Sequence, residues 1–455
     1  MRKNYILVIA FIFLSGCVMK EHKEISTLKI PQNFAQKSLG DKEISTYWWR
    51  DFHSPILNTL IDKALKRNYD ILSASQRIEQ AYLEVGIKDA LNYPNVNLSS
   101  NSSLSHKNST ISSSSFGVGV SYEIDLWGKI KSSKKIANAS LNISRYEFEA
   151  LRLSLISTIS SNYFNYLLLM QKLKLAQENL QIAQKIYAII NAKYKNGTIS
   201  SMELSRQKMV LLSQQSIILS LKTQKDEQLR ALALLCGEVP QNFLIKEESI
   251  ESIKTINIST PLPSTLLLHR PDIASSFEQL KIAEASIDTA NASKFPTFSL
   301  NANGGLASST LLFLTNPTSS IGAILGIDYT LFDGGKLDKE IKVEESKAKI
   351  AVQNYEKNLI TALKEVEDGL SSVERERQEA ILQKEILKEA QKTFNLSNIR
   401  YKEGTIELQI LLESQKTFFE AKQNRATQKL AQLNALITLV KVLGGGWSRG
   451  YSKII

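Results

Sequence analysis

The 455-residue sequence has little of what disulfide-stabilised folds and metalloenzymes are built on. It contains two cysteines, Cys17 and Cys236, and four histidines that lie singly at positions 22, 53, 106 and 269. Neither a disulfide framework nor a metal site with its usual ligand spacing is therefore expected. Cys236 stands in the apolar run LALLCG, which indicates a small buried hydrophobic side chain.

Motifs of catalysis and nucleotide binding are missing as well. The sequence contains no G-x-S-x-G, no P-loop and no G-x-G-x-x-G. The glycine-rich run GGGWSRG at 444–450 lacks the phosphate-binding lysine and follows a predicted helix instead of preceding one. The sequence therefore predicts neither an enzyme nor a bound cofactor.

Acidic residues are in the minority, because 45 Asp and Glu stand against 56 Lys and Arg, for a net charge of +11. An excess of this size also occurs in nucleic-acid-binding proteins, which is the alternative interpretation. The basic residues are, however, spread along long helical stretches and interleaved with Glu, without a basic run beside aromatic residues. The pattern favours solvated helix faces, and no nucleic-acid partner is expected.

The chain begins with a short apolar segment, MRKNYILVIAFIFLSGC. Two basic residues precede Ile6–Leu14, which is too short to cross a membrane and has the layout of a secretory signal. The segment ends in LSGC and resembles a bacterial lipobox, so residues 1–16 are predicted to be removed and Cys17 to be lipidated. The alternative is an ordinary apolar start with an incidental cysteine.

The residues after Cys17 bear on the compartment. Position 18 is Val and not the Asp of an inner-membrane retention signal, which favours the outer membrane of a Gram-negative bacterium. Residues 17–47 are polar and are expected to form an extended lipidated arm. No run of 18 apolar residues follows the signal, so no transmembrane helix is expected.

The most informative feature is an internal repetition. YKNGTI at 194–199 returns as YKEGTI at 401–406, an offset of 207 positions. The same offset relates ENLQIAQK to EILKEAQK, and an offset of 202 relates YPNVNL to FPTFSL further upstream. The unit is far longer than the roughly 20–50 residues of solenoid repeats, so the chain is predicted to be a tandem duplication of domain-sized halves.

Each half is predicted to contain a helix, two strands, a very long helix, a turn and another helix. The predicted boundaries are 48–237 for the first repeat, 238–269 for a small separate equatorial segment, 270–446 for the second repeat and 447–455 for a C-terminal tail. The strands are expected at about 95–126 and 297–332, and the helical hairpins at 128–236 and 335–443.

The strands are recognised by an apolar period of two. In the first half, residues of Gly, Ser and acidic type alternate with Phe116, Val118, Val120, Tyr122 and Ile124. The second half alternates in the same way from Ala323 to Leu331. An antiparallel sheet on a soluble core would alternate too. The other interpretation is a membrane barrel strand, apolar outside and polar toward a lumen.

The long helices are recognised by stretches without proline, from Lys129 to about Tyr194 and from Lys336 to Tyr401. Apolar residues in the first stretch keep the 3-4 spacing of a coiled-coil seam. About 66 helical residues would make a rod of roughly 100 Å. Gly197 and Gly404 fit the C-cap position at the end of each long helix and are expected to adopt positive φ. The repeated phrase is therefore predicted to be the turn of two equivalent hairpins.

Four strands per chain cannot close a membrane barrel, because known barrels have at least about eight. Two chains would supply eight strands, whose interior is filled by side chains, whereas three would supply twelve and leave room for a channel. The hairpins would then pack side by side into a tube. The expected fold class is an α+β membrane protein, a trimeric 12-stranded outer-membrane β-barrel continuous with a long periplasmic α-helical barrel.

Seven phrases, in order along nearly the whole chain, resemble the signature phrases of the TolC superfamily: YWWRDF, SYEIDLWGK, HRPDI, FPTFSL, LFDGGK, RYKEGTIELQILLESQ and LVKVLGGGW. They are most similar to the outer-membrane lipoproteins of RND-type efflux systems, the OprM and CusC group. The resemblance implies a homotrimer in contact with outer-membrane lipid that acts as a passive exit duct. It also implies a tripartite assembly with a periplasmic membrane-fusion adaptor and an inner-membrane RND transporter.

The resemblance also assigns gate residues. The family closes its periplasmic end with polar residues just after the second turn, where Tyr401 matches the aperture tyrosine and Glu413 the aperture acid. Lys416 stands where some members carry a basic partner, and Glu203 matches the acid that links to the tyrosine. A second acidic ring of some relatives would fall at Ile410 and is absent. The alternative for Glu413 and Lys416 is an ordinary surface pair on a helix.

Two further sets of residues belong to the expected channel. The hairpin turns are predicted to contact the adaptor, through Asn196, Gly197, Thr198, Ile199, Glu403, Gly404, Thr405 and Ile406. Trp127 ends an alternating strand and is expected at the membrane interface, because its ring is apolar on one edge and polar on the other.

The function that these observations predict is an outer-membrane exit channel for drugs or other toxic small molecules. A channel for metal-ion efflux or type I protein secretion is the nearest alternative, since the pump and not the duct usually selects the cargo. A periplasmic coiled-coil scaffold lipoprotein would explain the heptads but not the four strands. A lipid-anchored enzyme would lack any recognisable catalytic motif.

Overall fold

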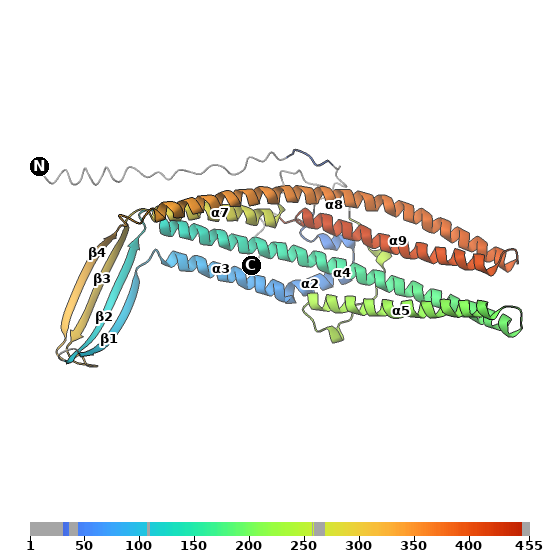
Figure 1. The fold of residues 1–455 in the computed structure, drawn as a ribbon, viewed down its shortest axis with the longest axis horizontal. Coiled ribbons are helices and arrows are strands. Elements are labelled where there is room, and N and C mark those ends of the chain that lie inside the picture. The colour runs from blue at the N-terminus through green and yellow to red at the C-terminus, as the bar shows by residue number, and fades with distance from the viewer. Residues whose placement is uncertain (1–30, 36–43, 107–109, 257, 259–268, 448–455) are drawn as a thin grey trace. The chain divides into compact units, whose positions relative to one another are not determined.

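The computed structural model of the chain describes residues 31–35, 44–106, 110–256, 258 and 269–447 (Figure 1). Cys17 and the signal segment lie outside the described residues. The chain forms two compact units. The first unit contains the described residues of Arg77–Arg145 and Ser275–Asn358. The second unit contains the described residues of Ile30–Gln76, Tyr146–Ala274 and Leu359–Ile455.

The two copies have the predicted order of elements. In the first copy they are α3 (Tyr69–Ala90), β1 (Asn95–His106), β2 (Thr110–Ile124), α4 (Lys129–Lys195) and α5 (Ser201–Leu235). In the second copy they are α7 (Pro271–Ala292), β3 (Thr297–Ser308), β4 (Thr318–Asp328), α8 (Lys336–Lys402) and α9 (Leu408–Val442). The long helices have 67 residues each and the returning helices 35 each, so the duplication is visible in the lengths of the helices.

The first unit contains a four-stranded antiparallel sheet in the order β1-β2-β3-β4 (Figure 1). Val120 lies opposite Val96 on one side and Ala302 on the other, and Leu300 lies opposite Leu325. Because side chains alternate between the faces of a strand, this register collects the predicted apolar residues on one face. The predicted division into an apolar and a polar face is confirmed.

Strand β4 ends earlier than the alternation predicts. The alternation predicts a strand as far as Leu331, but β4 ends at Asp328, whose partner Thr297 is the first residue of β3. Pro296 precedes Thr297 and has no N–H to donate, so β4 has no neighbour to pair with beyond this point. The carboxylate of Asp333 then accepts two backbone N–H groups at 2.8 Å each and caps the start of α8.

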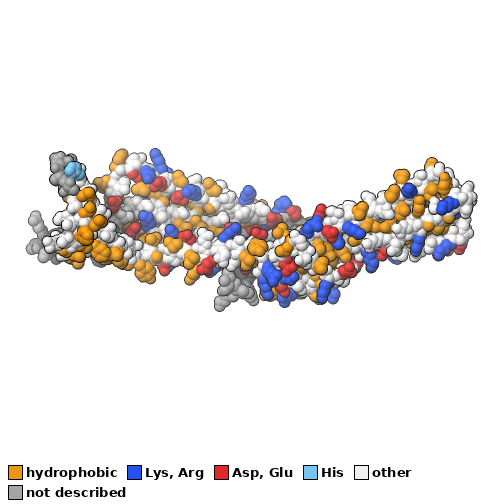
Figure 2. All heavy atoms as spheres, turned by 90° about the horizontal axis from the view of Figure 1, so that it is seen from below, with side chains coloured by type: hydrophobic (Ala, Val, Ile, Leu, Met, Phe, Trp, Pro, Cys, Tyr) orange, Lys and Arg blue, Asp and Glu red, His pale blue; other side chains and the backbone are white. Residues whose placement is uncertain are grey.

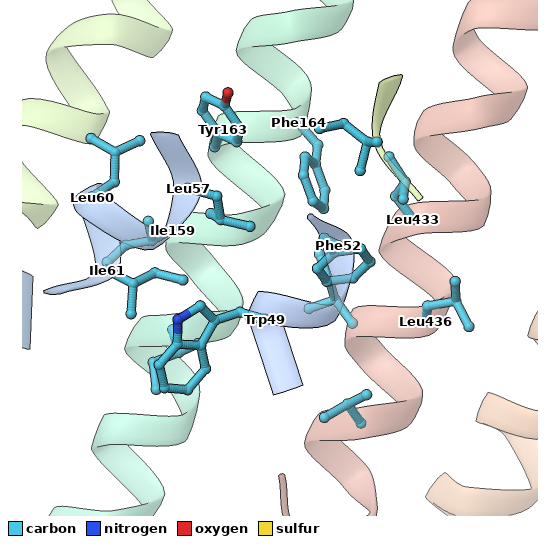
Figure 3. Close-up of a cluster of buried hydrophobic side chains, with 14 of the residues drawn as sticks. Trp49, Phe52, Leu57, Leu60, Ile61, Ile159, Tyr163, Phe164, Leu433 and Leu436 are labelled. Atoms are coloured by element: carbon cyan, nitrogen blue, oxygen red, sulfur yellow. The ribbon is translucent and has the colours of Figure 1, made fainter. Parts of the chain in front are cut away.

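The second unit has a hydrophobic core that the hairpin pattern alone does not predict. Trp49 and Phe52 of η1 (Trp48–Phe52) and Ile61 of α2 (Pro55–Arg67) are fully buried. They pack with residues from the middle of α4 and the second half of α9, among them Tyr163, Phe164, Leu433 and Leu436 (Figure 3). Aromatic side chains each bury about 150–250 Å² and dominate such cores. The N-terminal segment is thereby fixed to the hairpins.

Helix α2 is an element that the sequence analysis does not predict. Its start carries recognisable signals, because the hydroxyl of Ser54 accepts the N–H of Leu57 at 3.2 Å and Pro55 occupies the first helical position. The phrase HSPIL that begins this helix is not among the duplicated ones, so the repetition does not point to it.

The segment 238–269 is not a separate element in its described part, which corrects the expectation. Ile250 is fully buried in the same core as η1 and α2. The carboxylate of Glu248 accepts hydrogen bonds from the hydroxyls of Ser54 and Tyr163, both at 2.5 Å. Burial and this carboxylate raise the pKa of Tyr163 well above its ordinary value, which keeps the phenol protonated and donating. The described part of the segment therefore belongs to the core of the second unit.

Cys236 follows α5 and is fully buried, as the sequence predicts, with its Sγ 3.6 Å from the carbonyl oxygen of Leu60. Burial, reinforced by the nearby Glu238, raises the pKa of its thiol to about 11. At pH 8 the folded protein should therefore carry roughly a hundredfold less Cys236 thiolate than the denatured chain. Maleimide labelling should be slow until the protein unfolds. An exposed Asn196→Cys variant provides the fast control, and equal labelling of both thiols would contradict the burial.

Among the described residues, no helix carries an apolar run long enough to cross a membrane. On the face drawn in Figure 2, basic and acidic side chains lie intermixed. This mixture agrees with the predicted interleaving of Lys and Arg with Glu.

Candidate functional site

The polar face of the sheet is lined by small side chains. By register it includes Asn97, Ser99, Asn101, Ser113, Ser115, Gly117, Gly119, Ser299, Asn301, Asn303 and Gly305. The hydroxyls of Ser103 and Ser113 lie 2.9 Å apart and join two strands on this face. Strands β1 and β4 each have one neighbour in the described chain, so their outer N–H and C=O groups face no strand. Exposed apolar residues cover the opposite face, for example Val96 and Leu98.

Trp127 ties the two copies together in the first unit. Trp127 follows β2 and precedes α4 in the sequence. Its indole stacks on the ring of Phe295, which precedes β3, with ring centroids 4.7 Å apart. The indole N–H donates to the carbonyl oxygen of Pro296 at 2.7 Å. Trp127 therefore holds the strand-to-helix connection of the first copy against the helix-to-strand connection of the second. Its position at a membrane interface stays a prediction.

The two hairpin turns have the same backbone hydrogen bonds. In the first, the N–H of Gly197 bonds to the carbonyl of Tyr194 at 2.9 Å and the N–H of Thr198 to that of Lys193 at 3.0 Å. This pair of bonds is the Schellman motif, and the Thr198 hydroxyl adds a third bond to Lys193 at 2.8 Å.

In the second turn, Gly404 bonds to Tyr401 at 3.1 Å and Thr405 to Arg400 at 2.9 Å. The Thr405 hydroxyl again adds a bond to Arg400, at 3.0 Å. Gly197 and Gly404 have φ of 69° and 75°, so the predicted positive φ is confirmed at both. The remaining turn residues are mostly exposed, and their contact with an adaptor stays a prediction.

The expected gate residues lie near these turns but are not joined to one another. Tyr401 is in the last turn of α8, and Glu203 is exposed in the first turn of α5. Among the described residues, no hydrogen bond joins their side chains. The backbone N–H of Glu203 is instead capped by the Ser200 hydroxyl at 3.3 Å.

Glu413 is exposed on α9 and forms no ion pair within the described chain. Lys416 pairs with Glu420 at 3.8 Å, one turn further along the helix. The alternative of an ordinary Glu413–Lys416 surface pair is therefore not realised, and the assignment of both residues to a gate stays a prediction.

The returning helices are each followed by a glycine, Gly237 after α5 and Gly444 after α9, and the two glycines are related by the offset of 207. Gly237 and Gly444 have φ of 65° and 89°. A Cβ added at Gly237 would lie 2.4 Å from the carbonyl oxygen of Arg67, and at Gly444 1.7 Å from that of His269. Arg67 and His269 are related by the offset of 202, so both hairpins close onto the same point of their copy.

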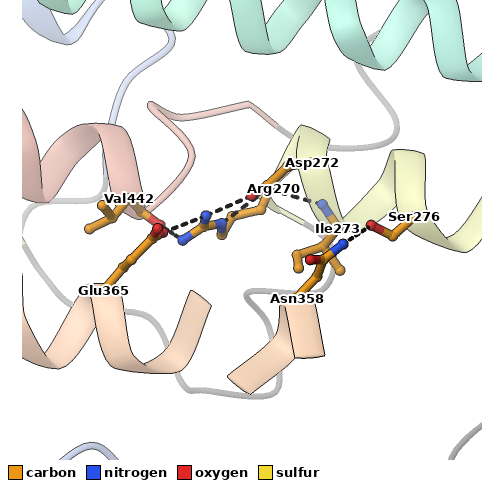
Figure 4. A network of polar contacts seen from close by, with 7 residues as sticks. All are labelled: Arg270, Asp272, Ile273, Ser276, Asn358, Glu365 and Val442. Atoms are coloured by element: carbon orange, nitrogen blue, oxygen red, sulfur yellow. Dashed lines mark hydrogen bonds and ion pairs between the residues drawn. The ribbon is translucent and has the colours of Figure 1, made fainter. Parts of the chain in front are cut away.

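The next residue along secures each closure. The amide of Asn68 donates to the carbonyl of Leu235 at 3.0 Å, and its counterpart Arg270 donates to the carbonyl of Val442 at 3.1 Å. Arg270 additionally forms ion pairs with Asp272 and Glu365, both at 2.7 Å (Figure 4). Helix α7 begins at Pro271, and proline is favoured at the first position of a helix. The only sequence signal for the role of Arg270 is that the offset of 202 relates it to Asn68.

Replacing Arg270 by the residue of the first copy, Arg270→Asn, should keep the bond to Val442 and lose both ion pairs. The side chain of Arg270 is 10% exposed, but those of Asp272 and Glu365 are 53% and 40% exposed, so solvent partly screens both ion pairs. The expected loss of unfolding free energy is therefore about 2 kcal/mol, which is less than for a fully buried pair. Thermal unfolding of the purified protein measures it. Asp368→Asn, which breaks an exposed pair with Lys364, is the control with an expected loss near zero. Equal unfolding temperatures for both variants would contradict the role.

These features agree with the comparisons to known proteins. A model of the family "Outer membrane efflux protein" matches residues 60–238 and 262–445, one segment for each copy. The chain belongs to this family. The resemblance to the TolC superfamily is confirmed, and with it an outer-membrane channel that is not an enzyme.

The chain matches several named relatives over nearly their whole length. It is 29% identical over 462 residues to the pyoverdine export outer membrane protein OpmQ of Pseudomonas aeruginosa, covering 98% of this chain and 97% of OpmQ. It is 27% identical over 446 residues to the cation efflux system protein CusC of Escherichia coli, covering 95% and 97%. It is 28% identical over 464 residues to the probable outer membrane lipoprotein SilC of Salmonella typhimurium, covering 98% and 100%.

The fold is shared with solved channels. The outer membrane channel CmeC of Campylobacter jejuni superposes with a TM-score of 0.84 at 25% identity, over 96% of each chain. Long helices with four antiparallel strands per chain and tandem halves are thus the family architecture. The protein resides in the Gram-negative outer membrane and extends into the periplasm, as predicted.

Proposed function

We propose that three copies of this chain form the exit channel of a tripartite RND-type efflux system. The observation that supports this most is the sheet, which has one polar face and two edges without a strand partner in the described chain. Pairing β1 of one copy with β4 of the next satisfies both edges, and three copies supply twelve strands. The polar faces then line a water-filled lumen and the apolar faces meet lipid.

The hairpin turns are the proposed docking points for a periplasmic adaptor, which in turn links the channel to an inner-membrane RND transporter. Their Schellman caps and threonine hydroxyls hold an exposed backbone in a fixed shape, which suits recognition of the turn itself. Cross-linking from Asn196→Cys and Glu403→Cys should capture the adaptor. If only cysteines at strand positions cross-linked to the adaptor, the proposed orientation, with the hairpin turns toward the adaptor, would be wrong.

Cys17 is proposed to carry the lipid anchor, supported by the LSGC sequence and by the name of the relative SilC. Mass spectrometry of the mature protein should find a diacylglycerol-modified N-terminus at this residue. An unmodified chain that starts elsewhere would reject the lipidation, while the barrel would still hold the protein in the membrane.

The cargo is proposed to be small toxic molecules, chosen by the pump. The names of the relatives differ in cargo, pyoverdine for OpmQ and cations for CusC, although both align over nearly their full lengths. Such a spread fits a passive duct better than a selective binding protein. Among the described residues, no cluster of three or more His, Cys, Asp or Glu is placed to hold a metal ion.

Deletion of the gene, followed by complementation, tests the function. The deleted strain should lose resistance to drugs, detergents or bile salts by at least fourfold and recover it with the intact gene. A loss confined to metal ions would favour cation efflux instead. Unchanged susceptibility to all of these, combined with loss of a secreted protein, would favour type I secretion. A chain that stays monomeric in detergent would contradict the channel.

A further inference from the structure

The connection between β3 and β4 exposes a run of apolar side chains. Residues 309–317, which we call the apolar loop, join the two strands at the end of the sheet away from α7 and α8 (Figure 1). No charged residue occurs between Lys294 and Asp328. Consecutive exposed apolar side chains are unfavourable in water and mark a surface that meets a partner or a membrane. The exposed apolar residues of the loop are Leu311, Leu312, Phe313 and Leu314.

The apolar loop lies over the apolar face of the sheet. Ser308 is separated from Leu306 and Leu300 by even numbers of residues on β3, so its side chain belongs to the same face. The Ser308 hydroxyl donates to the carbonyl oxygen of Thr315 at 2.6 Å and lies 2.6 Å from the hydroxyl of Thr310. Ser308 is buried while both leucines are exposed, because the loop folds back over it.

Strand β2 holds the loop from the same face. Ser112 shares its face with Ser114 and Phe116, and its hydroxyl donates to the carbonyl oxygen of Ser309 at 2.7 Å. Ser114 lies opposite Ser308 and is buried as well. The contacts from both strands therefore place the loop on the apolar side of the sheet and not over its polar side.

The apolar part of this face is short at the end where the loop lies. On β3 it runs from Phe298 to Leu306, and the next row outward consists of Ser102, Ser114 and Ser308. At roughly 3.4 Å per residue and a tilt of roughly 40°, this stretch covers about 20 Å of height, whereas the apolar band of a membrane barrel is about 25 Å tall. Further apolar surface is needed beyond the serine row.

The loop also supplies the aromatic ring that the outer ends of the strands lack. At the helix end of the sheet, Trp127 stacks on Phe295. Between Phe298 and Tyr329 the sequence contains one aromatic residue, which is Phe313 of the loop. Membrane barrels carry aromatic residues at both borders of the apolar band. Phe313 is in the position to provide the outer border.

The backbone of the loop has an uncommon conformation. Leu312 has a φ of 64° and Asn316 a φ of 46°. Asparagine tolerates this left-handed region, but a bulky side chain such as leucine seldom adopts it. Such a conformation persists where the surrounding contacts hold the chain, here the hydroxyls of Ser308 and Ser112, and it is concentrated in functional segments.

We propose that the apolar loop inserts into the outer leaflet of the outer membrane, where its leucines and Phe313 contact lipid acyl chains. The loop is continuous with the apolar face, which meets lipid in the proposed channel, and it extends this face past the serine row. An uncharged segment suits acyl chains and contains no cation for lipid phosphates. The inference rests on the proposed function, because it assumes that the apolar face of the sheet is turned toward lipid.

Quenching by lipid tests the contact. The full-length channel with Phe313→Cys is labelled with bimane maleimide and placed in phosphatidylcholine vesicles whose acyl chains carry bromine. Its fluorescence should fall at least twofold relative to vesicles without bromine. Ser105→Cys is the matched control, because Ser105 lies near the same end of the sheet but on its polar face, and its label should keep its fluorescence. The parent, labelled in the same way, gives the background from the native cysteines.

A third position separates the two possible failures. Val118 is exposed in the middle of the apolar face, so a label on Val118→Cys is quenched whenever this face meets lipid. Quenching at Val118 without quenching at Phe313 would overturn the inference and leave the channel intact. Absence of quenching at both would reject the lipid-facing sheet and with it the proposed channel. Disulfide cross-links between copies through Phe313→Cys would place the loops over the lumen and would also overturn the inference.

The preferred lipid thickness measures what the loop contributes. Replacing Leu311, Leu312, Phe313 and Leu314 together by serine removes apolar surface at the outer border. In a series of phosphatidylcholines of increasing acyl-chain length, the lipid that gives the highest unfolding temperature should therefore be at least one step shorter for the variant than for the parent. Single-channel conductance should stay unchanged, because the loop lies outside the lumen. The same preferred chain length for both proteins, or a raised conductance of the variant, would overturn the inference.

Discussion

Replacing Gly444 by alanine should prevent the second hairpin from closing. The new Cβ would lie 1.7 Å from the carbonyl oxygen of His269 and 2.7 Å from its carbon, and both are backbone atoms that no rotamer change can move away. The left-handed φ of 89° adds about 1–2 kcal/mol of strain for any residue with a Cβ. A loss of about 4 kcal/mol or more is expected, comparable to the most damaging single substitutions.

Gly404→Ala is the matched control. Gly404 also has a positive φ, 75°, but no atom lies within 4 Å of its added Cβ, so only the backbone strain remains. Gly237→Ala should fall between the two, because its Cβ would lie 2.4 Å from the carbonyl oxygen of Arg67. Folded yield and thermal unfolding of the purified protein give the order. Similar values for Gly444→Ala and Gly404→Ala would show that the base of the hairpin relaxes.

The parts of the fold that the sequence predicts are those set by local chemistry. A period of two marks the strands, the absence of proline permits the long helices, and glycine ends them at positive φ. The predicted start of α8 at Lys336 is confirmed, and the predicted end at Tyr401 is within one residue of the observed Lys402. The duplication strengthens each of these signals, because a weak pattern that occurs twice at one offset is rarely accidental.

The parts that the sequence does not predict depend on contacts between distant segments. Glu248 is one of several exposed-looking acids in EESIES, and only the fold places it against Ser54 and Tyr163. The sequence identifies Arg270 only as the residue before a helix start, although its side chain bonds to Glu365 of α8 and to the carbonyl oxygen of Val442 of α9. Neither contact belongs to a periodic pattern of residues, so the sequence of one chain does not predict either of them.

The candidate site also has a part that local chemistry predicts and a part that depends on contacts between distant residues. The turns were predictable because their geometry is local, and the structure shows both Schellman caps. The gate was inferred from resemblance alone, and the single chain neither joins Tyr401 to Glu203 nor pairs Glu413 with Lys416. The assignment of these residues to a gate therefore stays a prediction.

Removing the Glu413 carboxylate should change what the closed end of the channel admits. Glu413 is exposed and without an ion pair in the described chain, so nothing in the same copy neutralises it. In the proposed trimer three such carboxylates share one constriction, and a ring of charge with little water around it attracts cations and divalent ions strongly. Glu413→Ala should shift the reversal potential in a salt gradient toward zero and relieve block by divalent ions. Glu420→Ala, which removes an acid already paired with Lys416, is the control and should leave both properties unchanged.

Loosening the link between hairpins should act on conductance instead of selectivity. A hydrogen bond to a charged group contributes about 1.5–3 kcal/mol, so three copies of a Tyr401–Glu203 bond would hold the closed state firmly. Tyr401→Phe with Glu203→Gln should raise open probability at least tenfold in planar bilayers, since about 1.4 kcal/mol already changes an equilibrium tenfold. Tyr194→Phe removes the same hydroxyl at the equivalent position of the first hairpin and should have no effect. If the double variant opens no more often than the Tyr194 control, and Glu413→Ala selects like the parent, the closure lies elsewhere on the hairpins.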